Sequence, residues 1–185
     1  VTPDCAIWTA LITPQGKNLY DFFITEFEGR YLLDCEAARL MDLGRRLSKY
    51  KLRASVDLGK EEGMVVLAVY GDGVGECFGL TENPGEVAAF RDGIAFVDPR
   101  LADMGVRTIL GKKSAKAALE SIELEEVSAE NYDTFRLGLG IPDGSRDMIV
   151  EKSILLESNF EELNGVDWEK GCYMGQELTA RTKYR

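Results

Sequence analysis

The chain has 185 residues, enough to bury a substantial core as one large domain or two small ones. Its 22 basic and 32 acidic residues give a formal net charge of −10, which argues against a nucleic-acid-binding surface because such a surface needs a basic footprint. No histidine is present, so a Ser-His-Asp triad, a Cys-His dyad and a His-ligated zinc site are excluded. Any proton transfer must therefore use a carboxylate, lysine, tyrosine or thiol.

The first part of the chain predicts strands around one helix. Residues 6–13 and 19–25 are rich in β-forming residues and are separated by a Pro-Gln-Gly-Lys turn, which predicts a hairpin. Asp34 is a predicted N-cap for the helix that follows. In chain order the predicted elements are strands over 6–13, 19–25 and 31–33, a helix over 37–49, and strands over 52–58 and 64–70. This order predicts an α+β fold in which a helix covers an antiparallel sheet.

The second part of the chain is less regular. The glycine-rich segment 71–75 lacks the Lys-Ser/Thr pair of a phosphate loop, so a hairpin turn is the favoured interpretation. Residues 138–170 form a long irregular stretch, and such stretches tend to be functional. The remaining predictions are a strand over 94–97, helices over 114–122 and 128–137, and a division into an antiparallel α+β domain over 1–110 and a second part over 111–185.

The four cysteines are separated by 30 residues or more: Cys5, Cys35, Cys77 and Cys172. This spacing argues against a disulfide framework, a zinc ribbon and a permanent iron–sulfur cluster held by this chain alone, because such sites generally use closely spaced ligands. Unpaired cysteines favour a cytosol-like compartment. No apolar run approaches the ~20 residues needed to span a bilayer, so we expect no membrane segment.

Cys172 is the strongest candidate for chemistry. It follows Lys170 by two residues, and the segment after Gly175 predicts a helix over 176–181. A thiol just ahead of a helix N-terminus and near an ammonium group favours the thiolate, which is a better nucleophile, redox group or metal ligand. Lys170 and Cys172 are therefore the predicted catalytic pair. The alternative is that Cys172 is a small buried residue that closes a turn.

The segment Lys-Gly-Cys-Tyr-x-Gly-Gln-Glu followed by Thr-Ala-Arg, residues 170–181, resembles the signature of the YgfZ-type folate-binding proteins. These are relatives of the glycine-cleavage T-protein, and their mitochondrial members assist iron–sulfur cluster assembly. The likeness extends to segments 140–147 and 156–166, and more weakly to 10–17 and 50–54. It implies a T-protein-like fold that here lacks an N-terminal segment and a C-terminal barrel domain, with the 111–185 part contributing to folate binding.

The resemblance also implies a cofactor, partners and a location. The implied cofactor is a tetrahydrofolate, and the implied partners are iron–sulfur assembly proteins or client iron–sulfur enzymes. The implied location is the cytoplasm of a bacterium or the mitochondrial matrix of a eukaryote.

A reduced pterin calls for a carboxylate facing its guanidine-like edge, apolar walls, and a cation for the glutamate tail. The candidate cofactor-binding residues are Arg136, Arg146, Asp147, Glu157, Asn159, Tyr173, Gln176, Glu177 and Arg181. Alternative roles are open for all of them: a solvated loop for the first five, a loop anchor for Tyr173, helix capping for Gln176 and Glu177, and an i,i+4 ion pair for Arg181.

One residue departs from the T-protein-like pattern Arg-x-Glu-x-Gly-Ile-Pro, in which the Glu contacts folate. Gly138 stands at that position here, so we expect Glu157 to supply the missing carboxylate. The leading hypothesis is a folate-binding accessory protein for iron–sulfur cluster assembly or repair that acts through Cys172. A tetrahydrofolate-dependent aminomethyltransferase is the alternative enzyme, and a purely structural binding module would leave Cys172 dispensable.

Overall fold

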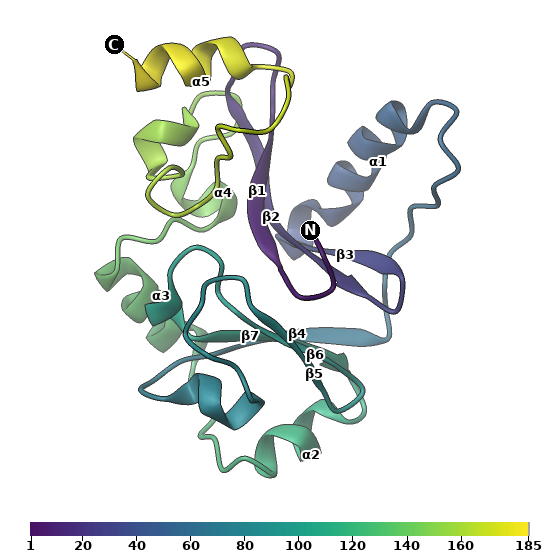
Figure 1. Cartoon of the computed structure of the whole chain (residues 1–185), viewed down its shortest axis with the longest axis vertical. Helices are drawn as coiled ribbons and strands as arrows, with labels where there is room; N and C mark the ends of the chain where they lie inside the picture. Colours follow the sequence, from purple (N-terminus) through teal and green to yellow (C-terminus); the bar gives the residue numbers. More distant parts are fainter. Residues whose placement is uncertain (185) are drawn as a thin grey trace.

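The computed structural model describes residues 1–184 and contains two antiparallel sheets with helices on their outer sides (Figure 1). The first sheet has the order β1-β2-β3, with β1 at Ile7–Ile12, β2 at Asn18–Phe27 and β3 at Arg30–Cys35. The second has the order β4-β7-β6-β5, with bounds Met64–Val69, Val106–Gly111, Gly93–Val97 and Val87–Phe90. Helix on antiparallel sheet is the predicted fold class, and it is confirmed.

The first sheet follows the predicted hairpin closely. Ile7 pairs with Ile24 and Trp8 with Phe23, and a bulge between Leu11 and Ile12 shifts the register next to the turn. Gly16 closes that turn with φ of 73°, a left-handed conformation that glycine adopts without steric cost. A Cβ atom at this position would lie 2.8 Å from the carbonyl oxygen of Gly175, so the absence of a side chain also lets the C-terminal loop approach the hairpin.

Helix α1, Leu40–Lys51, confirms the predicted helix but begins later than expected. A 3-10 turn, η1 at Ala37–Arg39, precedes it. The predicted N-cap role of Asp34 is wrong, because Asp34 belongs to β3 and pairs instead with an arginine of the second sheet. The helix buries Leu43 against a cluster that contains Leu19, Tyr20 and Phe22.

The predicted strand over 52–58 is wrong. These residues form no strand, and Leu52, Val56 and Leu58 are exposed. Alternation of apolar and polar residues describes a face that can pack, but a strand also needs a partner for its backbone groups. The next strand, β4, finds its partner in β7, with Val66 opposite Ile109.

The second sheet contains two strands that sequence analysis missed, β5 and β7. The segment 71–75 does not form a hairpin turn, because β4 is followed by a 3-10 helix, η2 at Val74–Phe78, rather than by its pairing partner. Every residue of β6 is buried, as expected for a strand covered on both faces. Gly93 lies so close to β7 that a Cβ atom there would be 2.0 Å from the carbonyl oxygen of Ile109.

The C-terminal part is helical and more ordered than predicted. Segment 138–170 contains short helices and sends Ile141, Met148, Leu155, Phe160 and Leu163 into the largest core cluster, where Phe160 stacks on Trp8 at 3.9 Å between ring centroids. Ser128 caps α3 by accepting a hydrogen bond from the Asn131 amide. The helices are α2 at Ala115–Glu120, α3 at Ala129–Gly138, α4 at Gly144–Asp147, η4 at Leu155–Ser158 and α5 at Gln176–Lys183, with a further 3-10 turn, η3, at Ala102–Met104.

Candidate functional site

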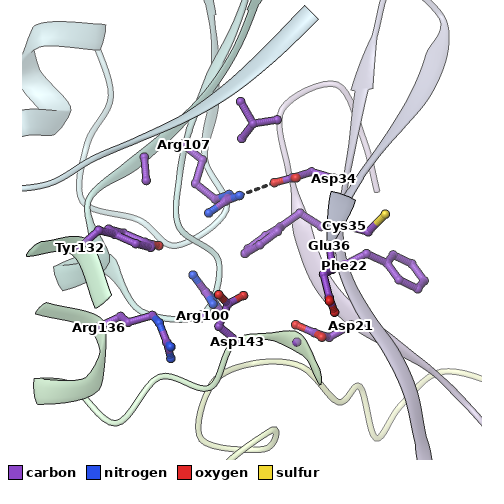
Figure 2. A pocket seen from close by; sticks show the side chains of 14 residues that line it. Asp21, Phe22, Asp34, Cys35, Glu36, Arg100, Arg107, Tyr132, Arg136 and Asp143 are labelled. Carbon is purple, nitrogen blue, oxygen red and sulfur yellow. Dashed lines mark hydrogen bonds and ion pairs between the residues drawn. The ribbon is translucent and has the colours of Figure 1, made fainter. Parts of the chain in front are cut away.

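A cavity of about 280 Å³ lies between the two sheets and is the main candidate site (Figure 2). We call it the inter-sheet pocket. Carboxylates of the first sheet and the loop after it line one side, and the other is lined by Arg107 of β7, Arg136 of α3 and Arg100 of the loop after β6. The charged lining residues are Asp21, Asp34, Glu36, Asp143, Arg100, Arg107 and Arg136.

Asp21, on β2, is a carboxylate with unused acceptor capacity. Its Oδ2 accepts a hydrogen bond of 3.2 Å from Nε1 of the buried Trp8, and Oδ1 has no side-chain donor among residues 1–184. Burial raises the pKa of the Asp21 carboxyl, and the negative charge of Asp143 raises it further. A carboxyl held in this way can protonate more readily than a surface aspartate.

Arg100, one of the lining residues, forms a buried ion pair. Its Nη2 lies 2.7 Å from Oδ2 of Asp98, its Nε donates to Oδ1 at 2.9 Å, and the two side chains are only 3% and 1% exposed. Burial opposes its positive charge, but Asp98 outweighs that effect and raises the pKa of Arg100. The guanidinium also lies 4.8 Å above the ring of Phe23 and donates to the Pro142 carbonyl, so it ties the loop after β6 to the loop before α4.

Arg107 links the two sheets directly. It extends from β7 to form an ion pair with Asp34 of β3, and its guanidinium lies 4.1 Å above the Phe23 ring. Burial opposes the charge of Arg107, but Asp34 raises its pKa. Its Nε is buried and has no hydrogen-bond partner among the described residues.

Three predicted site residues meet in one ion-pair network. Arg136 is buried and donates to Asp133 at 2.7 Å and to Asp147 at 2.6 Å, while the exposed Arg146 bonds the other oxygen of Asp133 at 2.6 Å. Of these residues only Arg136 lines the inter-sheet pocket. Both arginines have raised pKa values, Arg136 because its carboxylate partners outweigh the effect of burial, and Arg146 mainly because of its hydrogen bonds to Asp143 and Asp133.

Cys172 lies ahead of α5, where the sequence predicted it, and it is exposed. The alternative of a buried cysteine is therefore wrong. Lys170 places its ammonium 4.8 Å from the ring centroid of Tyr173, and both residues line a second cavity, described below. Cys172 lines neither cavity.

The other residues of the signature have local partners. Gln176 accepts a hydrogen bond of 3.3 Å from the Tyr173 amide, and Glu177 pairs with Arg181 one helical turn away. The ion pair matches the alternative stated for Arg181. The Tyr173 amide lies before α5, so the Gln176 contact holds the Cys172 loop and does not cap the helix. Glu157 and Asn159 are exposed at η4 and line neither cavity, so their roles in folate binding stay predictions.

Sequence analysis missed the residues at the centre of the pocket: Asp21, Asp34, Arg100, Arg107 and Tyr132. One signal was present in the sequence, because Asp21 interrupts the predicted strand 19–25 with a charge. The arginines carry no local signal, since each becomes part of the site only when two distant segments meet.

None of the helices within residues 1–184 is long and apolar enough to cross a membrane. In the same part of the chain, no group of three or more cysteine, aspartate or glutamate side chains is placed to hold a metal ion.

No protein-family model matches this chain. It is similar to curated proteins over nearly its whole length. It is 33% identical over 187 residues to the iron-sulfur cluster assembly factor IBA57, mitochondrial, of Mus musculus, covering 97% of this chain and 50% of the relative. Identity to the Homo sapiens protein of the same name is 34% over 178 residues, covering 92% and 48%. The Neurospora crassa homolog is 32% identical, with 96% and 42% covered. The chain thus spans about half the length of the curated relatives it matches.

The fold has a solved counterpart. The glycine cleavage system aminomethyltransferase T from Bartonella henselae aligns with a TM-score of 0.68 at 17% identity, covering 88% of this chain and 48% of that one. This likeness shows the fold, including the helix on antiparallel sheet. Together with the sequence similarities it confirms the resemblance to the YgfZ-type proteins of the T-protein-like superfamily, and the IBA57 proteins are homologues of this chain over nearly its whole length.

Proposed function

We propose that this chain is part of an iron–sulfur cluster assembly factor that binds a tetrahydrofolate in the inter-sheet pocket and acts through Cys172. Support for the assembly role comes from the relatives, which are named as mitochondrial iron–sulfur cluster assembly factors. If the source is a eukaryote, the same names support a mitochondrial location. The partners we propose are iron–sulfur assembly proteins or client enzymes.

The observation that carries the folate proposal is the unused carboxylate oxygen of Asp21 inside the pocket. A pterin has a guanidine-like edge of N–H groups, which suits a carboxylate acceptor. Phe23 and Tyr132 supply aromatic walls. The cavity of about 280 Å³ is close to the lower end of ligand sites, about 300 Å³, so it suits the ring system while the glutamate tail extends outward.

The thiol of Cys172 is accessible to a partner protein. Thiolate is a soft ligand suited to iron–sulfur clusters. A cluster needs several ligands, and Cys172 is a single exposed thiol on its loop, so we propose that it contacts a cluster transiently while a partner provides the other ligands. The cluster is then cargo and not a resident cofactor.

An aminomethyltransferase is the second candidate, and the T-protein fold favours it. The position of Gly138 argues against it, because the T-protein-like pattern has its folate-binding Glu there. Gly138 is exposed at the end of α3, and no atom lies within 4 Å of a Cβ built on it. An assay of the full-length protein with tetrahydrofolate and an aminomethyl donor separates the two functions, and turnover would overthrow the accessory role.

Cys172→Ser tests the assembly role in cells that lack the protein. We expect the full-length variant to fold normally, since oxygen replaces sulfur at an exposed site, and to fail to restore iron–sulfur enzyme activities. Cys77→Ser is the matched control because Cys77 is also exposed and lies on η2, outside both cavities. Full rescue by Cys172→Ser at normal protein levels would refute the role of the thiol.

Calorimetric titration of the full-length protein with tetrahydrofolate tests the proposed folate binding. We expect micromolar-range binding, because Asp21 would provide one charged acceptor while the glutamate that Gly138 replaces is missing, and one lost charged hydrogen bond costs about 1.5–3 kcal/mol, or one to two decades of affinity. If no binding is detected, folate binding is refuted and only the proposed role of Cys172 is left.

A further inference from the structure

A second cavity, of about 230 Å³, lies along the free edge of β1. Four consecutive strand residues line it, Ile7 to Ala10, together with residues of segment 164–173. Side chains alternate between the two faces of a strand, so a cavity lined by consecutive residues follows the edge of the strand and not a face. We call it the β1 groove. Figure 1 shows the C-terminal loop running beside β1, on the side away from β2.

Only one side of β1 has hydrogen-bond partners for its backbone groups. β1 is the edge strand of the first sheet and pairs with β2 alone, so the N–H and C=O groups of alternate residues point away from the sheet. In the part of the chain that the structure describes, the backbone of residues 7–12 makes no hydrogen bond beyond those to β2. Such a row of unpaired groups is a template for another strand.

β1 has two of the features by which proteins protect free edges, a bulge near its C-terminal end and a neighbouring loop, but its sequence adds no other. Its sequence, Ile-Trp-Thr-Ala-Leu-Ile, contains no charged residue and no proline. The opposite edge strand, β3, carries Arg30 and Asp34. β4 is uncharged as well, but it lines the inter-sheet pocket with Val66 and Ala68, which are two residues apart, so that pocket lies over a face of β4.

The far wall of the β1 groove indicates what kind of segment it accepts. Val166 and Tyr173 make part of it apolar. Lys170 and Asp167 add one charge of each sign, but Oδ1 of Asp167 already accepts hydrogen bonds from the backbone amides of Glu169 and Lys170. Within residues 1–184 the Lys170 ammonium has no carboxylate partner and lies above the Tyr173 ring. An apolar occupant that carries a carboxylate would satisfy both features.

We propose that the β1 groove binds an extended, apolar segment of a partner protein that bears a carboxylate and adds to the sheet as a strand beside β1. The backbone would provide affinity, and Lys170 would favour the acidic residue. The inference rests on the proposed function for the identity of the partner, because Cys172 lies on the loop that forms the far wall. A segment bound there holds the partner close to the thiol.

Titration of the full-length protein with a labelled, end-capped peptide Val-Thr-Val-Glu-Val-Thr tests the proposal. Two control peptides carry backbone N-methyl groups on either the odd or the even residues. Since only one set of amides can face β1, we expect one control to bind about tenfold or more weakly and the other to bind nearly as the parent. Hydrogen exchange should show new protection of alternate amides within residues 7–12. Equal binding of all three peptides, or unchanged exchange, would overturn the proposal.

Two protein variants sharpen the test. Lys170→Glu should weaken binding of the glutamate peptide and restore binding of a peptide with lysine in its place. Cys172→Ser should bind the peptide as the wild type does, since Cys172 does not line the groove, so failure of the thiol proposal and failure of this one are distinguishable. Protection of the same amides that rises with protein concentration, without peptide, would assign the edge to a second copy of the chain and overturn the proposal.

Discussion

Asp21→Asn tests whether the inter-sheet pocket is the folate site. Asparagine keeps the shape and can still accept the hydrogen bond of 3.2 Å from Trp8, so we expect the fold to be preserved. It removes the charge from a pocket carboxylate whose Oδ1 has no side-chain donor among the described residues. A hydrogen bond to a charged group contributes about 1.5–3 kcal/mol, so we expect tetrahydrofolate affinity to fall by about 10- to 150-fold.

The assay is calorimetric titration of the full-length protein, and Glu157→Gln is the matched control. Glu157 is exposed and lies outside both cavities, yet it was the carboxylate that the sequence favoured. We expect Glu157→Gln to bind as the wild type does. Unchanged binding by Asp21→Asn together with a loss in Glu157→Gln would refute the assignment of the pocket and restore the role predicted for Glu157.

Asp21→Asn should also change how the unfolding free energy depends on pH. Burial raises the folded-state pKa of Asp21 above its ordinary value of 3.8, so the folded state binds more protons than the unfolded state between the two values. Unfolding free energy therefore falls as pH rises through that window, and the loss is complete above the folded pKa. Denaturant titrations across this range should show the decline in the wild type and a smaller one in Asp21→Asn. Identical pH profiles would mean that Asp21 is not held in a desolvated site.

Two further substitutions and one labelling experiment test other parts of the structure. Arg100→Met leaves Asp98 buried without its partner and should lower the unfolding free energy by about 3–5 kcal/mol in chemical denaturation; a loss below about 1 kcal/mol would contradict a tightly held pair. Gly138→Ala should raise the unfolding free energy by about 0.4–1 kcal/mol, because a Cβ there meets nothing within 4 Å; a lower melting temperature would show hidden strain. Burial, followed by the charges of neighbouring carboxylates, raises the pKa of Cys35 to about 11 from 9.0, so its thiolate fraction near pH 8 should be roughly 100-fold lower than that of an ordinary thiol, and iodoacetamide should label the exposed Cys77 first.

Local patterns in the sequence were enough to predict the elements that form from neighbouring residues. The turn between β1 and β2 is formed by a short segment that is recognisable in the sequence. Helix α1 has its apolar residues at helical spacing. The loop that carries Cys172 was also predicted correctly, because glycines and the helix after Gly175 are neighbours in the chain. These elements depend on interactions between residues that are near one another along the chain, so composition and periodicity describe them.

Only the tertiary structure decided which strands pair and which side chains meet. The alternation over 52–58 predicted a strand, but β4 paired with β7, some forty residues farther along the chain, so 52–58 has no partner. The inter-sheet pocket likewise joins Asp21 of β2, Arg107 of β7 and Arg136 of α3. The ion pair of Arg107 with Asp34 and the raised pKa of Asp21 arise where the two sheets pack together, and burial is a property of the packed chain and not of any segment within it.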